Sequence, residues 1–220
     1  MKTKFILLLL SIITLSGFML INQKSKYRIL CFGDSITYGA GVEGNGWVEQ
    51  IANKYDNLIM INEGRKGRKT ADKEELLPIL EKHKDVDLIL ILLGVNDLKN
   101  GNDSLVNSCV LNMKWMITQI KNKLPDTKIL LLSPCSISLE TMTDLNKQKK
   151  YNENTYQSLI KLEKEYEKLA NEENIYFMSL FNVVSLKNFY DGVHPDLAGH
   201  KEIAEKVSEK ISSILELKID

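Results

Sequence analysis

Ser35 stands at the point where an apolar stretch of the chain ends and a polar one begins. Residues 29–32 are apolar, Gly33 permits a sharp turn, and Asp34 and Ser35 follow at once. This order is typical of a buried strand that passes into a helix. Ser35 can cap that helix, as Asp34 can, or it can be a nucleophile beside the N–H groups of the helix start. On this stretch alone the two interpretations stand about even.

Three later loops also concentrate polar side chains, at 62–70, 94–97 and 191–195. The first two follow apolar stretches that predict strands, and the third is the last loop before the closing helix. Sites in parallel α/β sheets form outside the carboxyl ends of the strands. We therefore expect these loops to meet Ser35 at one edge of a sheet.

The elements that must position these loops alternate along the chain. Strands are predicted at 27–32, 58–61, 87–93, 128–132 and 175–178, and helices at 47–55, 70–84, 106–122, 152–171 and 197–217. Pro78 predicts a break midway in its helix. The third strand is apolar on both faces, which places it centrally. The alternation predicts an α/β, doubly wound, flavodoxin-like three-layer sandwich with a mostly parallel five-stranded sheet.

The four polar blocks, in this order and spacing, resemble those of the SGNH (GDSL) hydrolase superfamily. No Gly-x-Ser-x-Gly pattern is present, which argues against an ordinary α/β-hydrolase. The resemblance covers essentially the whole chain after residue 26. The stretches 30–35, 63–70 and 132–134 look most like the arylesterase and acyltransferase branch.

The resemblance implies a role for each of five residues. Ser35 would be the nucleophile, His194 the base and Asp191 the acid that orients it. The oxyanion would be bound by the backbone N–H groups of Ser35 and Gly67 and by the side-chain amide of Asn96. No cofactor or metal is expected.

Elementary chemistry supports these residue types. A serine hydroxyl attacks well only if a base takes its proton, and histidine suits that task. An aspartate three residues before His194 can turn back to hold the correct tautomer. The spacing Asn-x-Gly-x-x-Gly-x-x-Thr favours Gly67 over Gly64 as the donor, since a glycine lets substrate approach its N–H closely.

Other polar or aromatic residues have simpler interpretations. His83 lies in a charged helix end and is expected to be exposed, and His200 is given little chance of a direct role. Asp34 and Asp97 are expected to brace their loops by hydrogen bonds. Trp47 is expected in the core.

The first residues differ from the rest of the chain. Lys2 and Lys4 precede a largely apolar segment, 5–21, which predicts either a cleaved secretory signal or a membrane anchor. A polar linker, 22–26, follows. We expect residues 1–26 to serve export, and residues 27–220 to form the hydrolase domain, either extracellular or on the outer face of the cytoplasmic membrane.

Composition restricts the class of protein. The 220 residues are 44% hydrophobic with balanced charge, which fits one globular domain and gives no support for nucleic-acid binding. Three widely spaced cysteines, Cys31, Cys109 and Cys135, predict neither a disulfide framework nor a zinc site. Cys31 and Cys135 are expected to be buried as small hydrophobes.

The predicted activity is hydrolysis or transfer of an acyl group from a small, lipid or sugar ester through an acyl-enzyme. A lysophospholipase, a carbohydrate O-deacetylase, a non-catalytic exported binding module and a thiol enzyme using Cys31 or Cys135 remain alternatives. The segment 133–150, with Leu139 and Met142, is expected to form the variable wall of the acyl site.

The loop around Gly67 is strongly basic, and its charges suggest an anionic substrate. They belong to Arg65, Lys66, Arg68 and Lys69.

Overall fold

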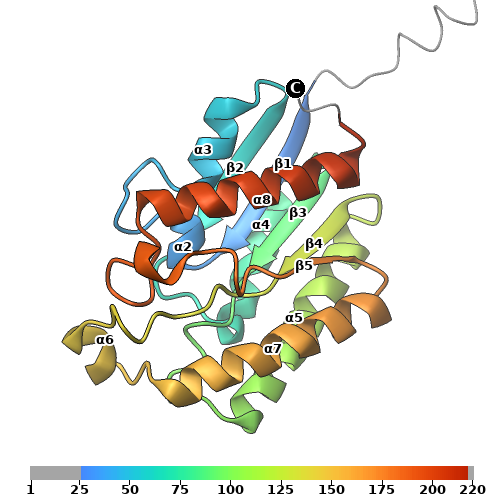
Figure 1. The fold of residues 1–220 in the computed structure, drawn as a ribbon. Helices are drawn as coiled ribbons and strands as arrows, with labels where there is room; N and C mark the ends of the chain where they lie inside the picture. The colour runs from blue at the N-terminus through green and yellow to red at the C-terminus, as the bar shows by residue number, and fades with distance from the viewer. Residues whose placement is uncertain (1–25, 218–220) are drawn as a thin grey trace, which may run out of the picture.

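The computed structural model describes residues 26–217, and its centre is a five-stranded sheet (Figure 1). The strands are β1 (Tyr27–Gly33), β2 (Leu58–Gly64), β3 (Leu88–Leu92), β4 (Lys128–Leu132) and β5 (Tyr176–Met178). Their order is β2-β1-β3-β4-β5, and all four pairings are parallel. The predicted doubly wound sheet is confirmed, with β3 in the middle.

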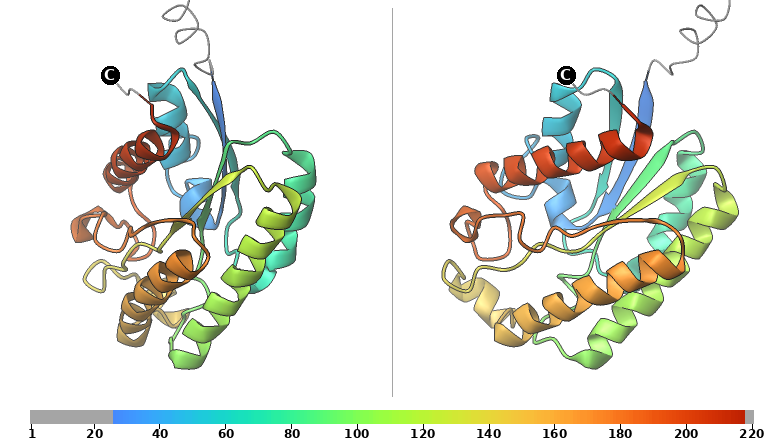
Figure 2. Two further views of the ribbon diagram at one scale, coloured as in Figure 1. Left: turned by 90° about the vertical axis from the view of Figure 1, so that its right-hand side faces the viewer. Right: turned by 45° about the vertical axis from the view of Figure 1, so that its right-hand side comes forward.

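Helices cover both faces of the sheet and give the predicted three layers (Figure 2). One face carries α3 (Trp47–Lys54) and α8 (Leu197–Leu215). The other carries α4 (Leu76–Lys82), α5 (Asp103–Lys123) and α7 (Glu153–Glu172). The short elements are α2 (Ser35–Tyr38), η1 (Thr70–Glu75), α6 (Asp144–Gln148) and η2 (Leu186–Asn188).

Alternation along the strands builds two separate cores. In β3, Ile89 and Ile91 face the α4–α5–α7 layer, whereas Leu88 and Leu90 face the α3–α8 layer. Successive side chains of a strand point to opposite faces, so a strand covered on both sides must be apolar throughout. Trp47 is fully buried in the α3–α8 core, as expected.

The predicted break in the helix over 70–84 exists, but Pro78 does not cause it. The chain forms the 3₁₀ helix η1 and then α4, with non-helical dihedral angles at Asp72 (φ −81°, ψ 24°). Pro78 lies in the first turn of α4, where its missing N–H has no intrahelical partner to lose. The prediction of a proline kink was therefore wrong.

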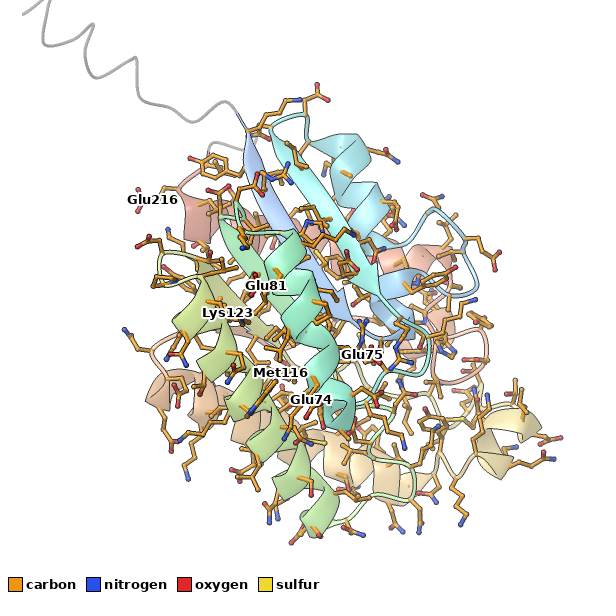
Figure 3. All side chains as sticks on the ribbon, turned by 180° about the vertical axis from the view of Figure 1, so that it is seen from behind. Glu74, Glu75, Glu81, Met116, Lys123 and Glu216 are labelled. Carbon is orange, nitrogen blue, oxygen red and sulfur yellow. The ribbon has the colours of Figure 1, made fainter. Side chains whose placement is uncertain are left out.

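Figure 3 shows α4 and α5 lying side by side on the back of the molecule. Glu81 of α4 and Lys123 of α5 form an ion pair, with 2.5 Å between Nζ and Oε1. Met116 of α5 is fully buried between this layer and the sheet. These helices lie behind the sheet and hold β3, whose carboxyl end leads to Asn96.

The segment 133–150 contains one element that the sequence did not predict, the short helix α6. The polar composition of this segment suggests an exposed loop, but Ser133, Ser136 and Ser138 are buried. Within residues 26–217 no helix is long and apolar enough to cross a membrane. The predicted export segment, 5–21, lies outside the described residues.

Candidate active site

Ser35 is the first residue of α2 and follows β1 after a single intervening residue. That residue, Asp34, caps α2, since its Oδ1 accepts the N–H of Ile36 at 2.9 Å. The turn depends on Gly33, because a Cβ there would lie 2.1 Å from Thr37 Oγ1 and 2.9 Å from the Leu92 oxygen. The capping role thus belongs to Asp34, and the Ser35 hydroxyl is available for another partner.

His194 and Asp191 continue a chain of hydrogen bonds from Ser35. The Ser35 Oγ lies 2.9 Å from His194 Nε2, and His194 Nδ1 lies 2.8 Å from Asp191 Oδ2. Asp191 Oδ1 accepts the backbone N–H groups of Val193 at 2.9 Å and His194 at 2.8 Å. Burial acts to raise the pKa of Asp191, but the hydrogen bonds from His194 outweigh it and hold the pKa at about 2. A carboxylate that stays charged can orient the imidazole and stabilise its protonated form.

The Asn96 side chain is buried and held on both ends. Its Nδ2 donates to the backbone oxygen of Arg68 at 3.2 Å, and its Oδ1 accepts the hydroxyl of Tyr151 at 2.9 Å. A primary amide has two N–H groups, so one donor remains for a ligand. Asn96 therefore has the chemistry of an oxyanion donor.

The two glycines of the loop 62–70, Gly64 and Gly67, differ in their surroundings. The N–H of Gly64 donates to Asn62 Oδ1 at 2.9 Å, and a Cβ on Gly64 would lie 2.3 Å from the backbone nitrogen of Tyr38. The N–H of Gly67 has no acceptor within residues 26–217, and no atom lies within 4 Å of its Cβ position. Gly67 has φ of +78°, which favours glycine. Of the two, only Gly67 offers a free N–H.

Arg68 ties this loop to the sheet. Its side chain is buried, with Nη1 donating to the backbone oxygens of Gly33 and Glu63 at 2.6 Å each. Its Nε donates to Glu75 Oε2 at 3.0 Å, and its guanidinium lies 4.2 Å from the centre of the Phe32 ring. The Arg68 side chain thus fastens the loop that carries Gly67 to the ends of β1 and β2.

Comparison with known proteins identifies the family to which this chain belongs. The family model of the GDSL-like lipase/acylhydrolase family matches residues 31–202, which is well over half of the chain. The chain belongs to this family. The predicted SGNH (GDSL) membership is confirmed, and the chain is a hydrolase of the GDSL-like type.

Solved structures share this fold over nearly their whole length. The M. smegmatis aryl esterase is 26% identical with a TM-score of 0.73, covering 85% of this chain and 99% of its own. Est24, a carbohydrate acetylesterase from Sinorhizobium meliloti, is 21% identical with a TM-score of 0.73, covering 86% and 100%. The psychrotrophic esterase EstA from Pseudoalteromonas sp. is 18% identical with a TM-score of 0.68, covering 87% and 100%. Among curated proteins, no sequence matches significantly.

The sequence suggested that the basic loop of this GDSL-like hydrolase presents four free charges. The structure shows that it does not. Arg65 pairs with Asp72 at 2.7 Å and with Glu75 at 2.8 Å, and Arg68 is buried against Glu75. Lys66 Nζ lies over the Tyr38 ring, 4.8 Å from its centre. Two of the four charges are neutralised, so the argument for an anionic substrate loses most of its basis.

Replacing Arg68 with methionine should lower the free energy of unfolding by about 2–4 kcal/mol, because the backbone oxygens of Gly33 and Glu63 each lose a charged donor and Glu75 loses its buried partner. Chemical denaturation measures this change. Arg65→Met on the same loop is the control, and its exposed ion pairs should cost less than about 1 kcal/mol. Equal destabilisation by the two variants would contradict the structural role assigned to Arg68.

The residues predicted to brace the site do so. Asp97 accepts the backbone N–H of Thr70 at 3.0 Å and its hydroxyl at 2.7 Å, joining the loop 94–97 to the loop 62–70. Asp34 braces the start of α2, and burial raises its pKa to about 7. Both expectations are confirmed.

Two histidines lie outside the site, and one prediction about them was wrong. His83 is not exposed: its side chain is 12% exposed and its Nε2 lies 2.9 Å from Glu63 Oε1. His200 is fully buried and its Nδ1 accepts the N–H of Trp47 at 3.2 Å. Burial lowers the pKa of His200 to about 4, so it stays neutral and joins α8 to the start of α3.

The cysteines show no nucleophilic setting. Cys31, Cys109 and Cys135 are free and buried, and burial raises the pKa of each thiol well above its usual range. A buried neutral thiol is unreactive, which weakens the alternative of a thiol enzyme. No group of three or more metal-ligating side chains occurs in the part of the chain that the structure describes.

Sequence reasoning missed four residues that contact the site. Arg68 was considered only as part of a charged loop, and Tyr151, Asn146 and Tyr190 were not considered. The Tyr190 ring stacks on His194 with ring centres 5.9 Å apart and planes at 20°. Its position next to Asp191 was a usable signal, whereas nothing in the sequence singled out Asn146.

Proposed function

We propose that this protein is a serine carboxylic ester hydrolase that works through an acyl-enzyme. The observation that carries the proposal is the continuous hydrogen-bond chain from Ser35 through His194 to the charged Asp191. Nucleophile, base and orienting acid are the parts that ester hydrolysis at a serine requires.

We assign each step of the reaction to one of these groups. Ser35 Oγ attacks the acyl carbon while His194 Nε2 takes its proton, and the carbonyl oxygen becomes an oxyanion. The N–H groups of Ser35 and Gly67 and the free N–H of Asn96 bind that oxyanion. His194 then gives the proton to the leaving alcohol oxygen, and the acyl-enzyme forms. Water then attacks the acyl-enzyme while His194 takes its proton, and the carboxylic acid is released from Ser35. If an alcohol attacks in place of water, the acyl group is transferred to that alcohol.

The substrate that we favour is a small or short-chain acyl ester. The solved aryl esterase from M. smegmatis shares 26% of aligned residues and nearly its full length with this chain. We infer a related substrate class here because the two chains share the fold, with a TM-score of 0.73.

A carbohydrate O-acetyl ester is the second candidate. The Tyr190 side chain is 48% exposed while it stacks on His194, so an aromatic surface lies beside the proposed base. Aromatic rings are large, rigid surfaces against which a sugar ring can pack. Est24, which has this fold, is described as a carbohydrate acetylesterase.

Labelling with a fluorophosphonate tests the proposal. The reagent should phosphonylate wild-type protein at Ser35, found by peptide mass, and should leave Ser35→Ala unlabelled. A panel of aryl acetates, longer aryl esters, acetylated sugars and lysophospholipids should then show the highest kcat/KM for short acyl chains. Wild-type protein that is folded but neither labelled nor active would indicate a non-catalytic binding module.

We also propose that residues 5–21 direct export, as a cleaved signal or as an anchor. β1 begins at Tyr27 on the amino-terminal edge of the sheet, and Ser35 lies at the carboxyl edge. An anchored chain would therefore hold its catalytic edge away from the end that enters the membrane. Fractionation of cells that express the chain with and without residues 5–21 tests this assignment.

A further inference from the structure

The stretch between β4 and α7 contacts both halves of the proposed catalytic machinery. We call residues 138–151 the bridging segment. Figure 1 shows it passing along the carboxyl edge of the sheet to α6 and turning back towards α7. On this path it meets the loop of Asp191 and His194 first and the loop of Asn96 afterwards.

Four donors from the bridging segment hold the backbone of the acid loop, the longest contact being that of the Thr143 hydroxyl with the Asp191 oxygen at 3.5 Å. Asn146, which is 2% exposed, donates its Nδ2 to the Asp191 oxygen at 3.0 Å. The N–H of Thr143 donates to the same oxygen at 3.2 Å, and the N–H of Ser138 donates to the Gly192 oxygen at 2.8 Å. The contact is close, because a Cβ on Gly192 would lie 2.5 Å from Met142 Cα.

At its other end the bridging segment holds the oxyanion amide. The Tyr151 side chain is buried, and its hydroxyl donates to Asn96 Oδ1 at 2.9 Å. One residue earlier, the oxygen of Lys150 accepts the N–H of Asn100 at 2.7 Å. The loop that carries Asn96 is thus fastened to the segment by a side chain and by the backbone.

These contacts determine which way the Asn96 amide points. The backbone oxygen of Arg68 can only accept, so the NH₂ group of Asn96 must face it, and Oδ1 must face Tyr151. The Tyr151 hydroxyl then serves as the donor that satisfies a buried carbonyl oxygen. Without this hydroxyl, the buried oxygen of Asn96 loses its partner, and only the Arg68 oxygen still orients the amide.

We infer that Tyr151 and Asn146 are positioning residues for catalysis, Tyr151 through the oxyanion amide and Asn146 through the loop of Asp191. Neither side chain needs to touch substrate. Because both belong to one segment, the acid–base half and the oxyanion half of the site are held in register by the same stretch of chain. This inference rests on the proposed function.

The first test is a double-mutant cycle on the oxyanion side. Tyr151→Phe should lower kcat about 10- to 100-fold and leave KM within about twofold, since the oxyanion exists only in the transition state. In the Asn96→Ala background, the same change should have little further effect. Tyr156→Phe is the matched control. The Tyr156 ring packs against the Phe181 ring, with 5.5 Å between ring centres, and the Tyr156 hydroxyl has no hydrogen-bond partner within residues 26–217. It should keep wild-type kcat.

The second cycle tests the acid side. Asn146→Ala should lower kcat, and in the Asp191→Asn background it should add little, because both changes act through the orientation of His194. Leu145→Ala, a neighbour in α6 that is 61% exposed, is the control and should keep wild-type kcat. Thermal unfolding of every variant separates lost positioning from lost folding.

The outcomes distinguish this inference from the proposed function. Wild-type protein that is not labelled at Ser35 contradicts the proposed function itself. Labelled, active wild-type protein in which Tyr151→Phe matches Tyr156→Phe overturns the positioning role of Tyr151. Fully additive effects in either cycle overturn the role of the residue concerned, since additivity means that it does not act through Asn96 or Asp191.

Discussion

Replacing Ser35 with alanine is expected to lower kcat by about 10⁵- to 10⁶-fold, because the acyl-enzyme can no longer form. The hydroxyl is the only group of Ser35 that lies against His194, and alanine removes it without filling the site. Steady-state hydrolysis of an aryl acetate measures the loss. Residual turnover above the rate in water would come from the oxyanion donors and substrate binding.

Two companion variants sharpen this result. Ser104→Ala changes an exposed serine at the start of α5 and should leave kcat unchanged. The pair Ser35→Ala and His194→Ala should lose no more activity together than Ser35→Ala alone, since the two residues act as a unit. Near wild-type activity in Ser35→Ala would overturn the mechanism.

Replacing Asp191 with asparagine is expected to lower kcat by about 10⁴-fold. The asparagine amide presents either an N–H donor or an uncharged oxygen to His194 Nδ1. The imidazole therefore loses the charged acceptor that holds its tautomer. The protonated imidazole also loses a nearby negative charge. Asp144→Asn, which removes an exposed carboxylate in α6, should have no such effect.

The lowered pKa of the Asp191 carboxylate predicts how the stability of the fold depends on pH. The pKa of Asp191 is about 2 in the folded protein against an ordinary value of 3.8. A lowered pKa means that Asp191 stabilises the fold above about pH 4, and that this contribution is lost as the pH falls towards 2. The difference between these two pKa values corresponds to about 2 kcal/mol of the free energy of unfolding.

Chemical denaturation at pH 7 and near pH 2 measures this dependence. Asp191→Asn should be less stable than wild type at pH 7, and the gap should narrow in acid. A gap that stays constant over this range would contradict the assigned role of the charged carboxylate in stability.

The sequence alone determined the order of the elements and the edge where the chemistry lies. Strand periodicity, helix periodicity and glycine positions are local properties, so they placed the five strands and the loops of Ser35, Asn96 and His194 without knowledge of distant contacts. The doubly wound topology followed, because parallel strands joined by helices have few arrangements. Element ends shifted by a few residues, as with β2, which continues to Gly64.

The tertiary structure alone revealed the supporting roles of Arg68, Tyr151 and Asn146. Arg68 appeared to be a surface charge, and only the fold shows its guanidinium buried under the ends of β1 and β2. Tyr151 and Asn146 lie 55 and 45 residues in sequence from the groups that they bind. Local patterns carry no information about such partners, because hydrogen bonds between distant loops depend on how the layers pack. The proposed catalytic residues and the braces Asp34 and Asp97 are therefore readable from the sequence, and the supporting residues Arg68, Tyr151 and Asn146 are not.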